Sequence, residues 1–143
     1  MSDPVMLGEA AKPQPTLTLD LAASKSGTVG NALRAGGTDV RLVDVTVEGA
    51  SVTGFRIFVN KPDASEATPI EEASYAGSVA FFPLPVAGQP SGTFVIDIDP
   101  ALERMVSKEM VSIDDPLTVT LVPIGAEDAR IGLGSSELVT PGG

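Results

Sequence analysis

The chain has 143 residues, enough for one domain with a continuous core, and its 43% hydrophobic and 20% charged residues are typical of a globular protein. Nineteen acidic against nine basic residues give a net charge of -10, which speaks against a nucleic-acid partner because phosphate groups would be repelled. Histidine and cysteine are absent, which excludes imidazole- or thiolate-based zinc and copper sites and Ser-His or Cys-His nucleophiles. The sequence therefore argues against an enzyme that acts on its own.

The first residues of the chain show no regular apolar pattern. Residues 1–15 contain Pro and Ala and are interpreted as an N-terminal arm or linker, ahead of a single domain over residues 16–143. The start lacks the basic segment followed by an apolar one that marks a secretory signal. No apolar run approaches the roughly 20 residues of a membrane span. We expect a cytoplasmic protein with no membrane association.

Two strands are predicted early in the domain. Thr16–Leu21 alternates polar and apolar residues, with three leucines on one face. Val40–Glu48 alternates in the same way, with Val43, Val45 and Val47 on its apolar face. Between them, the Gly-, Ser- and Ala-rich segment Ala22–Gly37 predicts an irregular connection, whose apolar contacts are Val29 and Leu33.

Three further strands are predicted in the middle of the chain. In Thr53–Asn60 the apolar side chains alternate, and the short loop Gly49–Thr53 before it indicates a hairpin with the preceding strand. Tyr75–Phe82 is apolar on both faces, so we expect an inner strand or one that is covered by something else. Gly92–Ile98 alternates again. The Pro-containing and acidic segment Lys61–Ser74 has no apolar period and is interpreted as a long exposed loop.

The last third of the chain predicts one helix and further strands. Asp99 followed by Pro100 is a helix-start signature, with Asp99 as the N-cap of a short helix over Pro100–Val106. Leu117–Val122 alternates as a strand that Pro123 is expected to end. Two terminal strands, or one strand broken by Gly134, are predicted over Arg130–Leu133 and Glu137–Val139. Seven or eight strands with one short helix indicate an all-β fold, an antiparallel β-sandwich.

Few side chains in the sequence suggest a catalytic or metal-binding site. Asp97, Asp99, Asp114 and Asp115 could supply oxygen ligands to calcium, but helix capping and turn formation explain them more simply. Adjacent Glu71 and Glu72 are interpreted as solvated loop charges rather than an acid/base pair. Met105 and Met110 are soft ligands for copper(I), although a methionine near the end of a helix more often packs in a core. We predict no catalytic residue, no metal site and no cofactor.

Four segments, in this order, resemble a known family: Phe55-Arg-Ile-Phe-Val-Asn60, Tyr75-Ala-Gly-Ser-Val-Ala-Phe-Phe-Pro83, Asp97-Ile-Asp-Pro-Ala-Leu-Glu-Arg-Met105 and Leu117-Thr-Val-Thr-Leu-Val-Pro123. Together they are similar to the C-terminal domain of the tyrosinase, catechol oxidase and plant polyphenol oxidase family. The resemblance covers about Val40 to Leu138, most of the chain. Each segment alone could be a strand of any protein, so the specificity of the resemblance comes from the order of the four segments.

The resemblance implies a β-sandwich or jelly roll that sits over the type-3 copper centre of a catalytic domain, as a lid or intramolecular chaperone. In that family six copper-binding histidines belong to the catalytic domain, and this chain has no histidine. What carries over is therefore the companion domain alone, with a tyrosinase-like copper oxidase as its partner. The family often places one bulky side chain in the active-site entrance. The candidates for this placeholder are Tyr75, Phe81, Phe82 and Leu84.

The alternation of a regular strand places Phe81 and Phe82 on opposite faces, so one ring is expected outside the main core and available to a partner. The sequence does not choose between them, and for each ring taken singly a place in the core is the simpler explanation. A second hypothesis is a structural module that assembles into a homo-oligomer through edge strands and the run Val79–Phe82. A carbohydrate-binding module is a third, weakened by the absence of Trp and the single Tyr.

Overall fold

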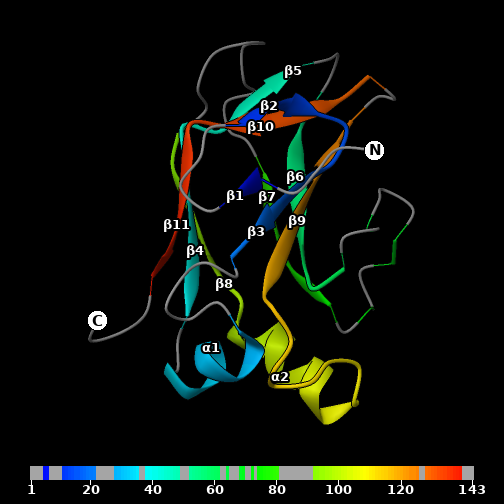
Figure 1. The fold of residues 1–143 in the computed structure, drawn as a ribbon. Coiled ribbons are helices and arrows are strands. Elements are labelled where there is room, and N and C mark those ends of the chain that lie inside the picture. Colours follow the sequence, from blue (N-terminus) through cyan, green and yellow to red (C-terminus); the bar gives the residue numbers. More distant parts are fainter. Residues whose placement is uncertain are drawn as a thin grey trace.

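The computed structural model describes residues 5–6, 11–21, 28–35, 38–48, 52–61, 64, 68–69, 72, 74–80, 92–125 and 128–139. These residues form a β-sandwich in which two sheets face each other, a third sheet lies across one end and two helices lie at the other (Figure 1). The predicted all-β antiparallel sandwich is confirmed. Among the described residues, no helix is long and apolar enough to cross a membrane.

The larger sheet has five strands in the order β1-β3-β9-β6-β7. Its neighbours are antiparallel except for β1, which runs parallel to β3. The strands are β1 (Val5–Met6), β3 (Leu17–Asp20), β9 (Thr118–Ile124), β6 (Gly54–Val59) and β7 (Tyr75–Ala80).

The facing sheet has the order β11-β4-β8, and the sheet across the end has the order β2-β10-β5. All of their pairings are antiparallel. The strands are β11 (Ser135–Val139), β4 (Asp39–Val43), β8 (Phe94–Asp97), β2 (Ala11–Gln14), β10 (Arg130–Leu133) and β5 (Thr46–Glu48). The helices are α1 (Val29–Ala35) and α2 (Asp99–Ser107).

The main core fills the space between the two facing sheets. The three leucines of the first predicted strand are buried there, as are Ile57 from β6 and Leu121 from β9. Phe55 from β6 meets Phe94 from β8 edge to face, with ring centroids 5.8 Å apart. This aromatic pair joins the two sheets.

A second, smaller cluster lies beside this core. Phe58 is fully buried with Val122 and Ala64, and Tyr75 packs against them. In β6, Phe58 alternates with the core-facing Ile57, which gives a strand with apolar side chains on both faces. The segment after β6 therefore contributes to burial: Ala64, Thr68 and Ser74 are buried, and the predicted wholly exposed loop over Lys61–Ser74 is wrong at these residues.

The predicted strand Val40–Glu48 is two strands in different sheets, and its predicted apolar face is partly wrong. Asp44, with φ of 53°, turns the backbone between β4 and β5 and shifts the alternation by one residue. Val40 and Leu42 are therefore buried before the turn, whereas Val43 is only partly buried. Because β5 pairs with β10 and β6 pairs with β7 and β9, the predicted hairpin into β6 is also wrong.

The segment interpreted as an irregular connection contains helix α1, so that prediction is wrong over Val29–Ala35. Val29 is buried and Leu33 packs against the core, as expected. Gly30 allows the helix to approach the segment before β9, because a Cβ atom at this position would lie 2.9 Å from the carbonyl oxygen of Ile113.

Helix α2 lies where the sequence predicted it, but its N-cap differs. The cap residue is Ile98, and no side chain caps it. Asp99 is in the first turn, and its N–H donates to the carboxylate of Asp97 (3.1 Å). The predicted capping role of Asp99 is therefore wrong.

Two strand predictions need correction in the larger sheet. Among the described residues β7 is the last strand in the sheet order, which does not fit the predicted inner strand, whereas the alternative of a strand covered by something else stays a prediction. β9 continues through Pro123 to Ile124, so Pro123 does not end it. Pro123 lies two residues past the last pair of β9 with β3, Leu17–Leu121, so its missing N–H costs no hydrogen bond on that side.

The two ends of the chain are also part of the sheets. β10 and β11 are separate strands in separate sheets, with Gly134 between them. Residues 1–15 contribute β1 to the larger sheet and β2 to the sheet across the end. The division of the chain into an arm and a single domain stays a prediction.

Candidate functional site

Of the four candidate placeholder residues, the structure describes Tyr75. Phe81, Phe82 and Leu84 lie outside the described residues. Tyr75 begins β7, and its ring packs on Phe58 with centroids 5.6 Å apart and planes at 59°. The ring is thus part of the smaller cluster, and its role toward a partner stays a prediction.

The start of β7 is held by several polar contacts. The N–H of Tyr75 donates to the carbonyl oxygen of Glu72 (3.1 Å), and the Ser74 hydroxyl donates to the Glu72 carboxylate (3.0 Å). That carboxylate also lies 3.5 Å from the Lys61 ammonium group. Arg104 of α2 donates to the carbonyl oxygen of Tyr75. These contacts fix the strand that leads into the remaining candidates.

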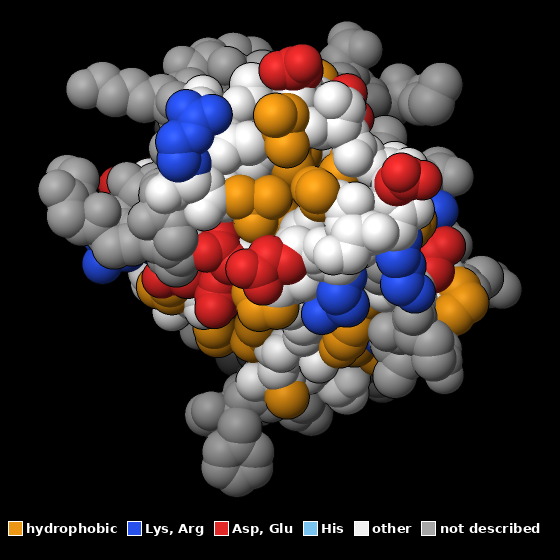
Figure 2. Space-filling view, turned by 90° about the horizontal axis from the view of Figure 1, so that it is seen from below, with side chains coloured by type: hydrophobic (Ala, Val, Ile, Leu, Met, Phe, Trp, Pro, Cys, Tyr) orange, Lys and Arg blue, Asp and Glu red, His pale blue; other side chains and the backbone are white. Residues whose placement is uncertain are grey.

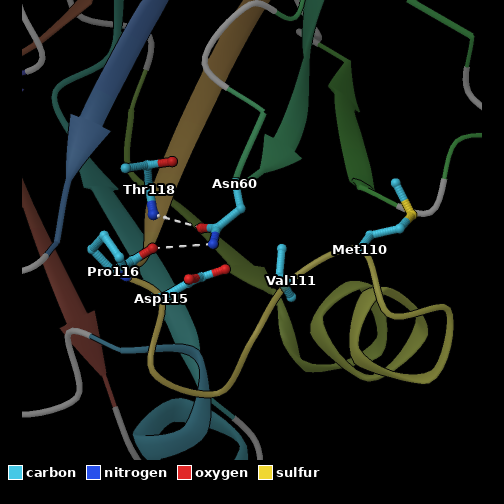
Figure 3. Close-up of a pocket in the computed structure, with 6 residues that line it drawn as sticks. All are labelled: Asn60, Met110, Val111, Asp115, Pro116 and Thr118. Carbon is cyan, nitrogen blue, oxygen red and sulfur yellow. Dashed lines mark hydrogen bonds between the residues drawn. The ribbon is translucent and has the colours of Figure 1, made fainter.

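A hollow of about 310 Å³ lies between the end of β6 and the segment that joins α2 to β9 (Figure 3). It was not predicted from the sequence. Polar and apolar side chains share its lining: Asn60, Met110, Val111, Asp115, Pro116 and Thr118.

Asn60 frames one side of this hollow. Its φ is 52°, a left-handed conformation that asparagine tolerates better than most residues. Its side-chain amide donates to the carbonyl oxygen of Pro116 (3.0 Å), and its side-chain oxygen accepts from the N–H of Thr118 (2.8 Å). Its own N–H donates to the Thr118 carbonyl oxygen (2.8 Å). The end of β6 is thereby joined to the start of β9.

Asp115 frames the other side. Its carboxylate accepts from the N–H of Ser112 (2.9 Å), and its own N–H donates to the Ser112 carbonyl oxygen (3.0 Å), which closes a turn. Its carbonyl oxygen accepts from the N–H of Val29 (3.0 Å), which anchors the turn to α1. Figure 3 shows the Asp115 carboxylate pointing toward Asn60 and Val111, into the hollow. A signal for this site existed in the sequence: an Asn that ends a strand and an Asp-Pro pair that starts another.

The acidic residues considered as calcium ligands are not brought together. Asp97 lies opposite Asp39 in the β4–β8 pairing, beside Asp99, whereas Asp114 and Asp115 belong to the turn before β9. Within the described ranges, no group of three or more Asp, Glu, His or Cys residues is arranged to hold a metal ion. Partial burial and the charges of Asp97 and Asp99 raise the pKa of Asp39 above its ordinary value.

The two methionines considered as copper(I) ligands, Met105 and Met110, differ in exposure. Met105 of α2 is buried in the main core, whereas Met110 is 50% exposed at the hollow. Viewed from the end that carries the helices, acidic side chains gather next to apolar ones (Figure 2). Lys and Arg side chains also stand on this face, so it combines apolar surface with charges of both signs.

Comparison with solved structures relates the whole fold to part of larger proteins. A recombinantly expressed latent aurone synthase (polyphenol oxidase) matches with a TM-score of 0.51 and 21% identity over 98% of this chain and 26% of that chain. Latent apple tyrosinase matches with a TM-score of 0.53 and 15% identity over 95% of this chain and 28% of that chain. The chain thus spans about a quarter of the length of these structures. No family model and no curated protein matches the sequence.

Proposed function

We propose that this chain is a non-catalytic companion domain that covers, stabilises or escorts a tyrosinase-like type-3 copper enzyme. The main support for the proposal is the likeness in fold to two proteins described as latent. The likeness covers 98% and 95% of this chain, but only 26% and 28% of those two proteins. The ordered segments around Phe55, Tyr75, Asp97 and Leu117 support the same family. Fold likeness alone does not assign a role, so a direct test is needed.

The composition agrees with a domain that leaves the chemistry to its partner. The chain has no histidine or cysteine for a copper site, so oxidation would take place in the partner. The segment after β7 would face the partner's active-site entrance, with Phe81, Phe82 or Leu84 as the side chain that enters it. The contacts that hold Tyr75 would present that segment from a fixed strand.

The proposal is tested by capture and inhibition. The full chain serves as bait for proteins of its native source, and the eluate is analysed for copper and for diphenol oxidation. A captured copper oxidase should be inhibited when more of the chain is added. Phe81→Ala or Phe82→Ala should relieve the inhibition, whereas Val95→Ala, which truncates a 57% exposed side chain on the facing sheet, should not. Equal inhibition by all three variants would contradict the placeholder role.

The competing function is a module that assembles with copies of itself. The outer face of the β11-β4-β8 sheet carries the exposed side chains Val95 and Val139 around the ion pair of Arg41 and Glu137, whose Nη1 and Oε1 atoms lie 3.0 Å apart. Two copies could pack there through their valines, with Arg41 of each copy pairing with Glu137 of the other. Light scattering of the purified chain separates the two functions: a defined homo-oligomer without an oxidase partner supports assembly.

A further inference from the structure

The hollow at the end of β6 combines one acidic group with an apolar wall. The Asp115 carboxylate and the Thr118 side chain lie on one side, and Val111 and Met110 lie on the other (Figure 3). One Asp115 oxygen accepts from the N–H of Ser112, and the second oxygen can accept from a ligand. The site therefore offers a negative charge at one end and aliphatic surface at the other.

The frame of the hollow is held in place before any ligand arrives. Asn60 ties β6 to β9 through the hydrogen bonds described above, and the Asp115 turn is bonded to α1 through Val29. The N–H of Gly30 adds a bond to the Ile113 carbonyl oxygen (2.8 Å) in the same turn. A ligand would thus find its polar partners already oriented, which lowers the entropic cost of binding.

We propose that this hollow binds the lysine or arginine side chain of a partner polypeptide. The aliphatic stem of such a side chain would lie along Val111 and Met110, and its charged end would donate to the Asp115 carboxylate. This proposal does not require that the partner be a copper enzyme.

Size and charge favour this occupant over others. A volume of about 310 Å³ is at the lower end for small-molecule pockets, so one long side chain fits better than a larger cofactor. The net charge of -10 attracts a basic partner and repels an anion. Since Asp115 is the only acidic side chain among the lining residues that the structure describes, a metal ion would lack there the several oxygen ligands that calcium needs.

The test uses nuclear magnetic resonance of the full chain. The probe is a blocked pentapeptide with one arginine between glycines, compared with its lysine counterpart and with a neutral norleucine counterpart. We expect saturable shifts of the Val111 and Thr118 amides and of the Asn60 side-chain amide with the two basic peptides. The norleucine peptide should give little shift, because it lacks the charged end.

Two matched variants decide whether Asp115 carries the binding. Asp115→Asn removes the charge but keeps a side-chain oxygen for the Ser112 N–H, so the fold should be retained and the saturable shifts lost. Glu103→Gln removes one charge from an exposed position on α2 and should leave the shifts unchanged. Absence of saturable shifts in the unaltered chain, equal responses of the two variants, or shifts spread over the whole acidic surface would overturn the proposal.

Discussion

Asn60 joins two strands through its backbone and its side chain at once. Its left-handed φ of 52° and its bonds to Pro116 and Thr118 all depend on an amide side chain at this position. Few residue types meet these conditions together, because most side chains disfavour positive φ and most lack a donor and an acceptor on one short stem. The residue is thus a determinant of how β6 meets β9.

Asn60→Ala should destabilise the domain by about 2–4 kcal/mol, because the left-handed conformation becomes strained and the Thr118 N–H loses its acceptor. Asn60→Asp tolerates the conformation and keeps the acceptor, so its loss should be smaller than that of Asn60→Ala: about 1 kcal/mol for the bond to Pro116, plus the repulsion between the new oxygen and the Pro116 carbonyl oxygen. Urea denaturation of both variants measures these differences. Equal losses would show that the side-chain acceptor does not matter.

The raised pKa of Asp39 predicts that the stability of the fold depends on pH. On one side it lies opposite Asp97 of β8 and on the other opposite Val139 of β11, with Arg41 two residues further along the strand and Asp99 nearby. Partial burial and the two neighbouring carboxylates raise its pKa above the ordinary value of 3.8.

The folded state therefore holds the Asp39 proton more tightly than the unfolded state does, and ionisation of Asp39 destabilises the fold. This cost is absent below about pH 3.8, grows as the pH rises through the folded-state pKa and is complete above it. Asp39→Asn should raise stability at pH 7, by on the order of 0.5 kcal/mol for a like-charged cross-strand pair. The gain should vanish near pH 3, whereas Glu103→Gln should give no such trend. Chemical denaturation of the variants at several pH values measures the gain in stability. If the gain from Asp39→Asn persisted at pH 3, ionisation of Asp39 would be excluded as its cause.

At the scale of elements, β7 depends on a very close approach to β6. A Cβ atom on Gly54 would lie 2.1 Å from the carbonyl oxygen of Val79, a backbone atom that cannot move without separating the strands. The register places Gly54 opposite Ala80, at the point where β7 leads to the candidate placeholder residues. Pairing at this point therefore fixes the end of β7 against β6.

Gly54→Ala should destabilise the domain by about 2–3 kcal/mol, because the added methyl group forces β6 and β7 apart. Ser78→Ala, at an exposed position of the same strand pair, should change stability by less than about 0.5 kcal/mol. Chemical denaturation compares the two. If Gly54→Ala were as mild as Ser78→Ala, the close approach would not constrain this pair.

The elements also show what periodicity can and cannot predict. Regular alternation of apolar residues located β3, β6, β8 and β9. It predicted the buried face of β3, whereas β6 and β9 bury side chains on both faces. It failed at Asp44, where a single left-handed residue splits one apolar run between two sheets, and at α1, whose small residues mask the helical pattern. Local sequence patterns do not encode which sheet a strand joins, so the false hairpin before β6 could not have been recognised.

Long-range contacts explain why the hollow was missed. Its lining comes from the end of β6 and from the segment between α2 and β9, which lie about fifty residues apart in the chain. Only the pairing of β6 with β9 brings Asn60 next to Pro116 and Thr118. The Asn and Asp-Pro signals were visible in the sequence, but nothing there indicated that they meet.

At the scale of the whole molecule, the central claim is that this sandwich acts on another protein. The fold matches about a quarter of a latent aurone synthase (polyphenol oxidase) and of a latent apple tyrosinase, and the companion role is our proposal from this likeness. The order of four segments along the chain suggested the family before the fold was known.

The most direct measurement is the diphenol oxidation rate of the copper enzyme that this chain captures, with and without added chain. Our account predicts a copper-loaded oxidase in the eluate, saturable inhibition by the chain, and recovery of activity with Phe81→Ala or Phe82→Ala. An eluate that contains only the bait, as a discrete oligomer free of copper, would contradict the account and favour self-assembly.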